Sequence, residues 1–221
     1  MNHRGSALDP SFPNMIAARL QEVGAYCRGG HYVYTSGQHG AEYLDKEAVY
    51  THPDLTKVVC RRLVEPWSEH NIEAVVAPAL GGIALTQWIA YHLMHRNGRA
   101  VLAVYAKKVE DGFAFTQRRA QLISGKRVLV AEDVLTTGGT ARKTVDLVRA
   151  HGGIVVGVTV IWNRGNVTSA ALGVARHTEL FAPQLVTYPA ESCPRCEQHV
   201  PANVDLGHGR KFLAERAAMR T

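Results

Sequence analysis

Residues 128–140 read VLVAEDVLTTGGT, and this stretch decides the fold. Its first four residues are apolar and rich in Val, as expected of a strand covered on both faces. Two adjacent acids follow, then a turn of hydroxyl and glycine residues. A helical pattern then runs over residues 140–150, with Ala141, Val145 and Val148 on one face. Strand, turn and helix in this order predict one unit of a parallel α/β sheet.

The same alternation occurs elsewhere in the chain. Further apolar runs of strand length are Ala74–Ala77, Ala100–Ala106 and Ile154–Ile161. An amphipathic helix is expected between Pro53 and Pro66, since proline suits a first helical turn and also stops a helix. Repeated strand–helix–strand units predict a doubly wound, mainly parallel sheet flanked by helices, whose ligands bind beyond the carboxyl ends of the strands.

The composition narrows the class of protein. The chain has 221 residues, 46% of them hydrophobic, and a net charge of +6, which excludes a disordered chain and favours a phosphorylated or polyanionic ligand. Four cysteines are too few for a disulfide scaffold, and no apolar stretch reaches the ~20 residues of a membrane span. We therefore expect a cytoplasmic protein with neither membrane nor nucleic acid as partner. Its expected parts are a disordered N-terminus at 1–10, one domain at 11–190 and a C-terminal tail at 191–221.

The turn after the acids has the chemistry of a phosphate site. Its glycines let the backbone approach an anion, and its amides and hydroxyls donate to phosphate oxygens at a helix N-terminus. The candidate phosphate ligands are Thr136, Thr137, Gly138, Gly139 and Thr140. Glu132 and Asp133, expected where the strand ends, can accept hydrogen bonds from a vicinal diol such as that of ribose. The alternative is an ordinary strand and helix with two solvated acids.

Two further segments carry candidate residues. Leu80, Gly81 and Gly82 follow the strand Ala74–Ala77 and open a helix, so their amides can meet a second anion. Taken alone, an ordinary strand-to-helix turn explains them as well. Residues 105–119, YAKKVEDGFAFTQRR, place two basic pairs around a glycine, which fits either a solvated hairpin or a mobile, anion-binding loop.

Residues 128–140 resemble the signature of the type I phosphoribosyltransferase family, namely a hydrophobic strand, two acids and a Thr-Thr-Gly-x-Thr loop. The resemblance implies that the domain at 11–190 has that family's fold, with a small N-terminal hood. It implies that loop 136–140 binds the 5′-phosphate of phosphoribosyl pyrophosphate and that loop 80–82 cradles the pyrophosphate. It also implies that Lys107 and Lys108 neutralise the leaving pyrophosphate, that Mg²⁺ bridges substrate oxygens near Glu132 or Asp133, and that the chain forms a homodimer.

Within the family, the resemblance is greatest to the branch of pyrimidine synthesis whose acceptor is orotate. Residues 30–45, GHYVYTSGQHGAEYLD, resemble the Ser-Gly segment that folds over the pyrimidine, and Asn163–Gly165 resembles a late turn whose Arg meets the orotate carboxylate. The planar fork of Arg164 suits a carboxylate, and Tyr43 suits the flat face of a base, although a surface Arg and a core Tyr are the plain alternatives. The lid of this branch carries a further Lys and His that are missing here, so Arg118 or Arg119 is a candidate substitute.

Two alternatives to an orotate enzyme remain open. One is a phosphoribosyltransferase for a purine base, and the other is a non-enzymatic regulator that senses phosphoribosyl pyrophosphate and binds nucleic acid. Near the C-terminus, Cys193 and Cys196 have metal-ligand spacing, with His199 and His208 nearby. A zinc ion at Cys193 and Cys196 is one hypothesis, and two reduced structural thiols are the other.

Overall fold

The structure, a computed structural model, describes residues 12–110 and 112–218, and these residues form two compact units. The larger unit spans residues 52–184, and the smaller unit combines residues up to 51 with those from 185 onward. The N-terminal segment 1–10 lies outside the described residues. The division into 11–190 and 191–221 stays a prediction, but contacts group the C-terminal segment with the N-terminal one.

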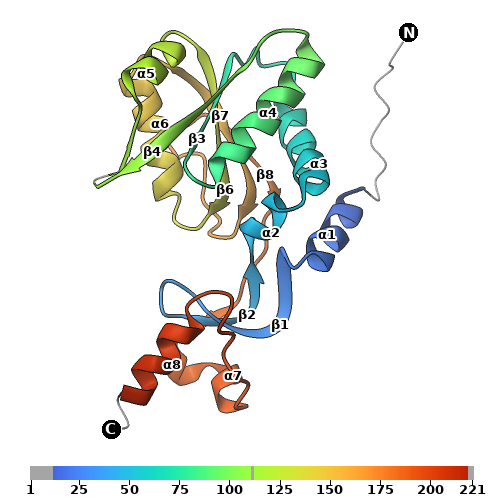
Figure 1. Cartoon of the computed structure of the whole chain (residues 1–221), viewed down its shortest axis with the longest axis vertical. Helices are drawn as coiled ribbons and strands as arrows, with labels where there is room; N and C mark the ends of the chain where they lie inside the picture. The colour runs from blue at the N-terminus through green and yellow to red at the C-terminus, as the bar shows by residue number, and fades with distance from the viewer. Residues whose placement is uncertain (1–11, 111, 219–221) are drawn as a thin grey trace. The chain divides into compact units, whose positions relative to one another are not determined.

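A six-stranded sheet forms the centre of the larger unit (Figure 1). Its strand order is β5-β4-β3-β6-β7-β8, and all neighbours are parallel except β4 and β5. The strands are β3 (Ala74–Pro78), β4 (Leu102–Val109), β5 (Gly112–Ala114), β6 (Arg127–Leu135), β7 (Ile154–Asn163) and β8 (His177–Phe181). This confirms the expected doubly wound, mainly parallel sheet and all four of the predicted strands.

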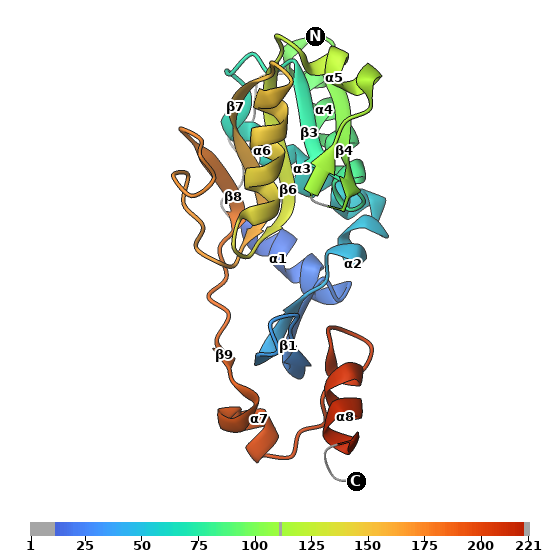
Figure 2. The same ribbon diagram turned by 90° about the vertical axis from the view of Figure 1, so that its left-hand side faces the viewer.

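Helices cover both faces of this sheet. The helices are α3 (Pro53–Val64), α4 (Gly82–Asn97), α5 (Gln117–Ile123) and α6 (Gly139–Ala150), with a 3₁₀ turn at Glu65–Trp67. Figure 2 looks onto α6 in front of the strands, whereas α3 and α4 pack against each other on the opposite face. Val145 and Val148 of α6 are fully buried against Val130 and Val158 of the sheet, as the periodicity predicts. Burial of this apolar surface stabilises the sheet and fixes where its loops emerge.

The strand order creates a topological switch point. From β3 the chain crosses to β4 on one side, and it later adds β6 on the other side of β3. The loops that follow β3 and β6 therefore leave the same sheet edge in opposite directions and border a crevice, which is where open α/β sheets bind their ligands.

The smaller unit is built on an antiparallel sheet in the order β1-β2-β9. Its elements are α1 (Phe12–Glu22), β1 (Tyr26–Val33), β2 (His39–Leu44), α2 (Lys46–Tyr50), β9 (Thr187–Tyr188), a 3₁₀ turn at Ala190–Ser192, α7 (Pro194–Glu197) and α8 (Gly209–Ala218). The C-terminal segment runs along β1, because the Asn203 and His208 amides donate to the carbonyls of His31 and Val33 at 2.8 Å each. No helix among the described residues is long and apolar enough to cross a membrane.

Candidate active site

Strand β6 extends four residues further than the sequence predicts. Glu132 and Asp133 therefore lie inside the strand rather than beyond its end, and they are only 6% and 4% exposed. Pairing with β7 continues through Glu132 to Leu135, which explains the extension. The Asp133 amide donates to Glu132 Oε1 at 3.2 Å. Since successive strand residues face opposite sides of a sheet, the two carboxylates leave the backbone in different directions.

The loop that follows β6 presents donors to the crevice. Gly138 has φ of 79°, and a Cβ there would lie 2.7 Å from Val167 Cγ1, so both backbone conformation and packing require glycine. The hydroxyls of Thr136, Thr137 and Thr140 lie on exposed residues, and α6 begins at Gly139 with no side-chain cap. Its first-turn amides can therefore bind an anion, with the helix dipole adding to the attraction.

The loop that follows β3 is built similarly. Leu80 is 84% exposed, and the peptide bond between Ala79 and Leu80 is cis. Helix α4 begins at Gly82, where a Cβ would lie 2.4 Å from Ala77 Cβ. Only glycine allows the helix to start this close to the strand, and Gly81 at the N-cap position makes no side-chain cap. The structure thus places Leu80, Gly81 and Gly82 at a second uncapped helix N-terminus on the same sheet edge.

The turn that carries Arg164 is joined to the phosphate loop. The amides of Arg164 and Gly165 both donate to the Leu135 carbonyl at 3.1 Å. A Cβ on Gly165 would lie 1.6 Å from the Thr136 carbonyl oxygen, so these backbones are in direct contact. Arg164 itself is half-buried. The structure therefore brings Arg164 next to residues 136–140, as expected of one site.

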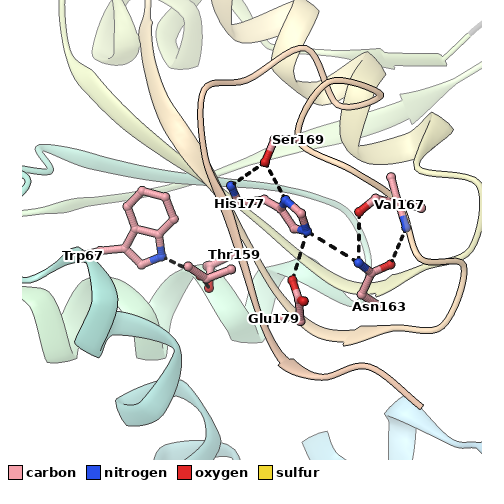
Figure 3. Close-up of polar contacts among 8 residues, drawn as sticks. Trp67, Thr159, Asn163, Val167, Ser169, His177 and Glu179 are labelled. Atoms are coloured by element: carbon pink, nitrogen blue, oxygen red, sulfur yellow. Dashed lines mark hydrogen bonds and ion pairs between the residues drawn. The ribbon is translucent and has the colours of Figure 1, made fainter. Parts of the chain in front are cut away.

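Buried polar contacts hold this turn in place (Figure 3). The Asn163 side chain donates to the Val167 carbonyl at 3.0 Å and accepts from the Val167 amide at 2.9 Å. His177 lies beside Asn163, and its Nδ1 contacts Ser169 Oγ at 2.7 Å while its Nε2 contacts Glu179 at 2.9 Å. Asn163 thus holds the turn that carries Arg164 in shape, a role that the sequence-based prediction did not assign to it. Its signal was a polar residue at the end of an otherwise apolar strand.

The basic segment forms a hairpin, not a long loop. Lys107 pairs with Ala114 and Lys108 with Phe113 in the β4–β5 ladder, and both lysines are exposed. The Ala106 carbonyl accepts the Ala79 amide at 2.8 Å, so the hairpin starts beside the loop after β3. Of the two candidate lid arginines, Arg119 lies 3.7 Å above the Tyr105 ring, whereas Arg118 is exposed.

The remaining candidates lie in the smaller unit. Tyr43 is half-buried there, with its ring 5.4 Å from that of Tyr32, and its assignment to the base stays a prediction. Cys193 and Cys196 lie close to His31 and His39, two histidines that the sequence analysis did not connect with them. Of the two histidines it did name, His208 contacts Thr35 Oγ1 at 3.1 Å, and neither belongs to this group.

The larger unit therefore combines two uncapped helix N-termini, two buried carboxylates and an arginine turn at one sheet edge. The two helix N-termini can bind a ligand that has a phosphate at each end, and the carboxylates can accept hydrogen bonds from hydroxyls between those phosphates. The arginine can pair with a planar anion. A helix–dipole and hydrogen-bond site of this kind needs no lysine in its loop.

Comparison with known proteins agrees with this chemistry. Residues 46–179 match the phosphoribosyl transferase domain family, and the chain belongs to that family. Among curated relatives, the orotate phosphoribosyltransferase of Pelotomaculum thermopropionicum is 37% identical over 187 residues, covering 85% of this chain and 93% of the relative.

Solved structures confirm the fold. The orotate phosphoribosyltransferase of Mycobacterium tuberculosis aligns with a TM-score of 0.62 at 24% identity, over 77% of this chain and 96% of that one. The same enzyme in complex with 5-phospho-α-D-ribosyl 1-diphosphate aligns at 0.59, with 23% identity and the same coverage. An adenine phosphoribosyltransferase from Rhodothermus marinus aligns at 0.57, with 23% identity over 77% of this chain and 99% of that one. The fold alone therefore does not select the acceptor base.

Proposed function

We propose that this chain transfers the phosphoribosyl group of phosphoribosyl pyrophosphate to orotate, forming orotidine 5′-monophosphate and pyrophosphate in pyrimidine nucleotide synthesis. The observation that carries the proposal is the contact between the loop 136–140 and the Arg164 turn. The Arg164 and Gly165 amides both donate to the carbonyl of Leu135, the residue directly before the loop. This backbone contact supports assigning the phosphate loop and Arg164 to one site, where the guanidinium would suit a carboxylate-bearing acceptor. The name of the 37% identical relative supports the same acceptor.

The phosphoribosyl donor is assigned to the two helix N-termini. Thr136, Thr137, Gly138, Gly139 and Thr140 bind the 5′-phosphate in this proposal, and Leu80, Gly81 and Gly82 bind the pyrophosphate. Charge-assisted hydrogen bonds contribute about 1.5–3 kcal/mol each, so several backbone and hydroxyl donors suffice to hold a phosphate. Glu132 and Asp133 lie on β6, just before loop 136–140, and in this proposal their oxygens accept from the ribose hydroxyls.

A Mg²⁺ ion fits the residues present. Glu132 or Asp133 would supply the hard carboxylate oxygen that Mg²⁺ prefers, and a bound substrate would supply further oxygens. When bound with the substrate, the ion would neutralise charge on the pyrophosphate.

The residues act mainly through electrostatics. The ribosyl carbon becomes cationic as the bond to pyrophosphate breaks, and the Glu132 and Asp133 carboxylates stabilise that positive charge. The exposed Lys107 and Lys108 on the β4–β5 hairpin stabilise the negative charge of the departing pyrophosphate. No covalent nucleophile is required, because a nitrogen of orotate attacks the ribosyl carbon directly.

The acceptor is oriented by Arg164, whose guanidinium pairs with the orotate carboxylate through two parallel hydrogen bonds. The Asn163–Val167 contacts keep the turn in the conformation that presents Arg164. A purine lacks the carboxylate, so this arginine discriminates against purine acceptors. The proposal would extend to a purine only if Arg164 made no contribution to acceptor binding.

The decisive experiment is a spectrophotometric assay of orotate consumption with phosphoribosyl pyrophosphate and Mg²⁺. Adenine, hypoxanthine, xanthine and uracil are assayed in parallel, and the nucleotide product is identified by mass spectrometry. We expect turnover with orotate and at most trace turnover with the four other bases. Turnover of another base without turnover of orotate would contradict the proposal, and so would binding of phosphoribosyl pyrophosphate without any transfer.

We also propose that the active species is a cytoplasmic homodimer, as its family resemblance implies. Light scattering coupled to gel filtration should give twice the chain mass. A monomeric mass at enzyme concentrations that support full turnover would rule the dimer out.

A further inference from the structure

Four metal-ligating side chains converge in the smaller unit, and none of them is assigned to phosphoribosyl transfer. They are His31 of β1, His39 of β2, Cys193 just before α7 and Cys196 within α7. One ligand atom from each lies within 4.8 Å of all the others. Among the described residues, no other group of three or more His, Cys, Asp or Glu has this arrangement.

The distances match a tetrahedral site. His31 Nε2 lies 2.9 Å from His39 Nδ1, 3.7 Å from Cys196 Sγ and 3.8 Å from Cys193 Sγ, and Cys196 Sγ lies 3.4 Å from His39 Nδ1. Zinc bonds of 2.0–2.1 Å to nitrogen and 2.3 Å to sulfur at tetrahedral angles require about 3.3 Å between two nitrogens and about 3.6 Å between nitrogen and sulfur. Each of these four distances is within about 0.4 Å of the required value. All the ligand atoms lie within 4.8 Å of one another, so a contraction of at most about 1 Å would bring the four onto one ion.

The neighbouring backbone orients three of the ligands. His31 Nδ1 lies 2.7 Å from the Val200 carbonyl, which can only accept, so Nδ1 carries the hydrogen and the lone pair of Nε2 faces the cluster. A second-shell carbonyl of this kind is typical of metal-bound histidine. The amides of Cys196 and Glu197 both donate to the Cys193 carbonyl, which closes the Cys-Pro-Arg-Cys turn and brings the two sulfurs to one side.

Burial makes the cluster costly without a ligand. His39 and Cys193 are fully buried and His31 is 3% exposed, while Cys196 is half-buried. Polar groups removed from water destabilise a fold unless they are satisfied. Two thiolates and two neutral imidazoles around Zn²⁺ have no net charge, so the metal would satisfy the four ligand atoms without leaving a buried charge.

We propose that His31, His39, Cys193 and Cys196 bind a structural Zn²⁺ ion that fastens the C-terminal segment to the β1–β2 hairpin. Two sulfur and two nitrogen donors in a tetrahedral arrangement select zinc over the hard ions magnesium and calcium. Four protein ligands leave no open coordination position, so the role is structural and not catalytic. The proposal does not depend on which base the enzyme uses.

The ion would join parts of the chain that are far apart in sequence. His31 and His39 flank the turn between β1 and β2, and the cysteines lie more than 150 residues later. Small units commonly need a metal or disulfide for stability. The Cys193–Cys196 pair has the alternative chemistry of a disulfide or of two free thiols, and both cysteines are reduced in the structure.

The first test measures the metal directly. The full chain is purified without a metal-binding tag, dialysed against Zn²⁺ and then metal-free buffer, and analysed by plasma mass spectrometry. We expect about one zinc ion per chain in the wild type and less than about a tenth of that in Cys196→Ser and His39→Ala. Cys27→Ser, which changes a half-buried cysteine of β1 outside the cluster, and His199→Ala should keep the full amount.

A second measurement avoids variants that fail to fold. Wild-type protein is refolded with Co²⁺ in place of zinc, and its visible spectrum is recorded. Intense d–d bands with thiolate charge-transfer absorption are expected for a tetrahedral site with two sulfurs. Zinc below stoichiometry in freshly reduced wild-type protein, a Co²⁺ spectrum without thiolate absorption, or full zinc retention in Cys196→Ser would each overturn the proposal.

Discussion

The two units of this molecule place their functional side chains in different ways. In the larger unit, the phosphate loop and the acids come from one continuous stretch, residues 128–140, and the strand order delivers the other loop to the same edge. In the smaller unit, the His and Cys cluster is assembled from three segments, none of which has a complete set of ligands. A site made of contiguous backbone can be recognised in a sequence, whereas a site made of scattered side chains becomes visible only after folding.

The largest expected effect is that removing zinc destabilises the smaller unit and leaves the larger unit folded. Removing zinc with a chelator should expose the amides of residues 12–51 and 185–218 to hydrogen exchange while residues 52–184 remain protected. Structural zinc contributes on the order of 10 kcal/mol to small metal-binding folds, which is enough to unfold the smaller unit. The measurement is hydrogen exchange by mass spectrometry, before and after re-addition of Zn²⁺. Equal loss of protection in both units would mean that zinc does not stabilise the smaller unit selectively.

The second prediction concerns the acids of β6. Asp133→Asn should lower kcat/KM about 100-fold, because it removes a negative charge beside the cationic ribosyl carbon while keeping the size of the side chain. The matched control is Asp146→Asn, which changes an exposed aspartate of α6 that pairs with Arg142 at 2.9 Å. Steady-state kinetics with orotate decide the matter. A comparable loss in both variants would show that Asp133 has no special place in the reaction.

The third prediction separates the two substrates. Arg164→Ala should raise KM for orotate about 30-fold, the loss expected from a charge-assisted hydrogen-bonded pair worth about 2 kcal/mol. KM for phosphoribosyl pyrophosphate should change far less, because backbone amides and hydroxyls hold the 5′-phosphate. Arg96→Ala, at the far end of α4 from the loop after β3, serves as control. If both Michaelis constants rose equally, Arg164 would not be an acceptor ligand.

The smallest effect tests the contact between loop and turn. Gly165→Ala should destabilise the larger unit by about 1–3 kcal/mol, since the added methyl would overlap the Thr136 carbonyl and the backbones must separate. In Gly139→Ala the nearest atom to the new Cβ lies 3.5 Å away, so stability should be nearly unchanged. Urea unfolding of both variants measures the difference. Equal stability would mean that the contact between the Arg164 turn and the phosphate loop is loose.

Much of the larger unit could be predicted from the sequence because its patterns are local. Hydrophobic runs locate β3, β4, β6 and β7, and the glycines of the two loops mark where backbone and helix approach closely. The end of β6 was predicted too early, since pairing with β7 carries the strand through two acids that alone would suggest exposure. Register between strands is a tertiary property, so no local pattern gives it.

Of the cluster in the smaller unit, the sequence predicts the two cysteines but not the two histidines. The Cys193–Cys196 spacing indicates a metal, but His199 and His208 are closer in sequence than the histidines that lie beside these sulfurs. His31 and His39 flank a β-turn, and only the antiparallel pairing of β1 with β2 brings them together. Asn163 is similar, because its contacts with Val167 depend on a turn whose shape the sequence does not state.

The Leu135 carbonyl limits how the choice of acceptor can change. This one oxygen accepts hydrogen bonds from the Arg164 and Gly165 amides, the first two of the turn after β7. A longer or shorter turn would break these bonds and displace Leu135, which leads into the phosphate loop. A protein engineer seeking a new base specificity should therefore keep the backbone and the glycine at 165 and exchange only the side chain at 164. At this turn, a change of acceptor preference is therefore expected to come from the side chain at 164 and not from the length of the backbone.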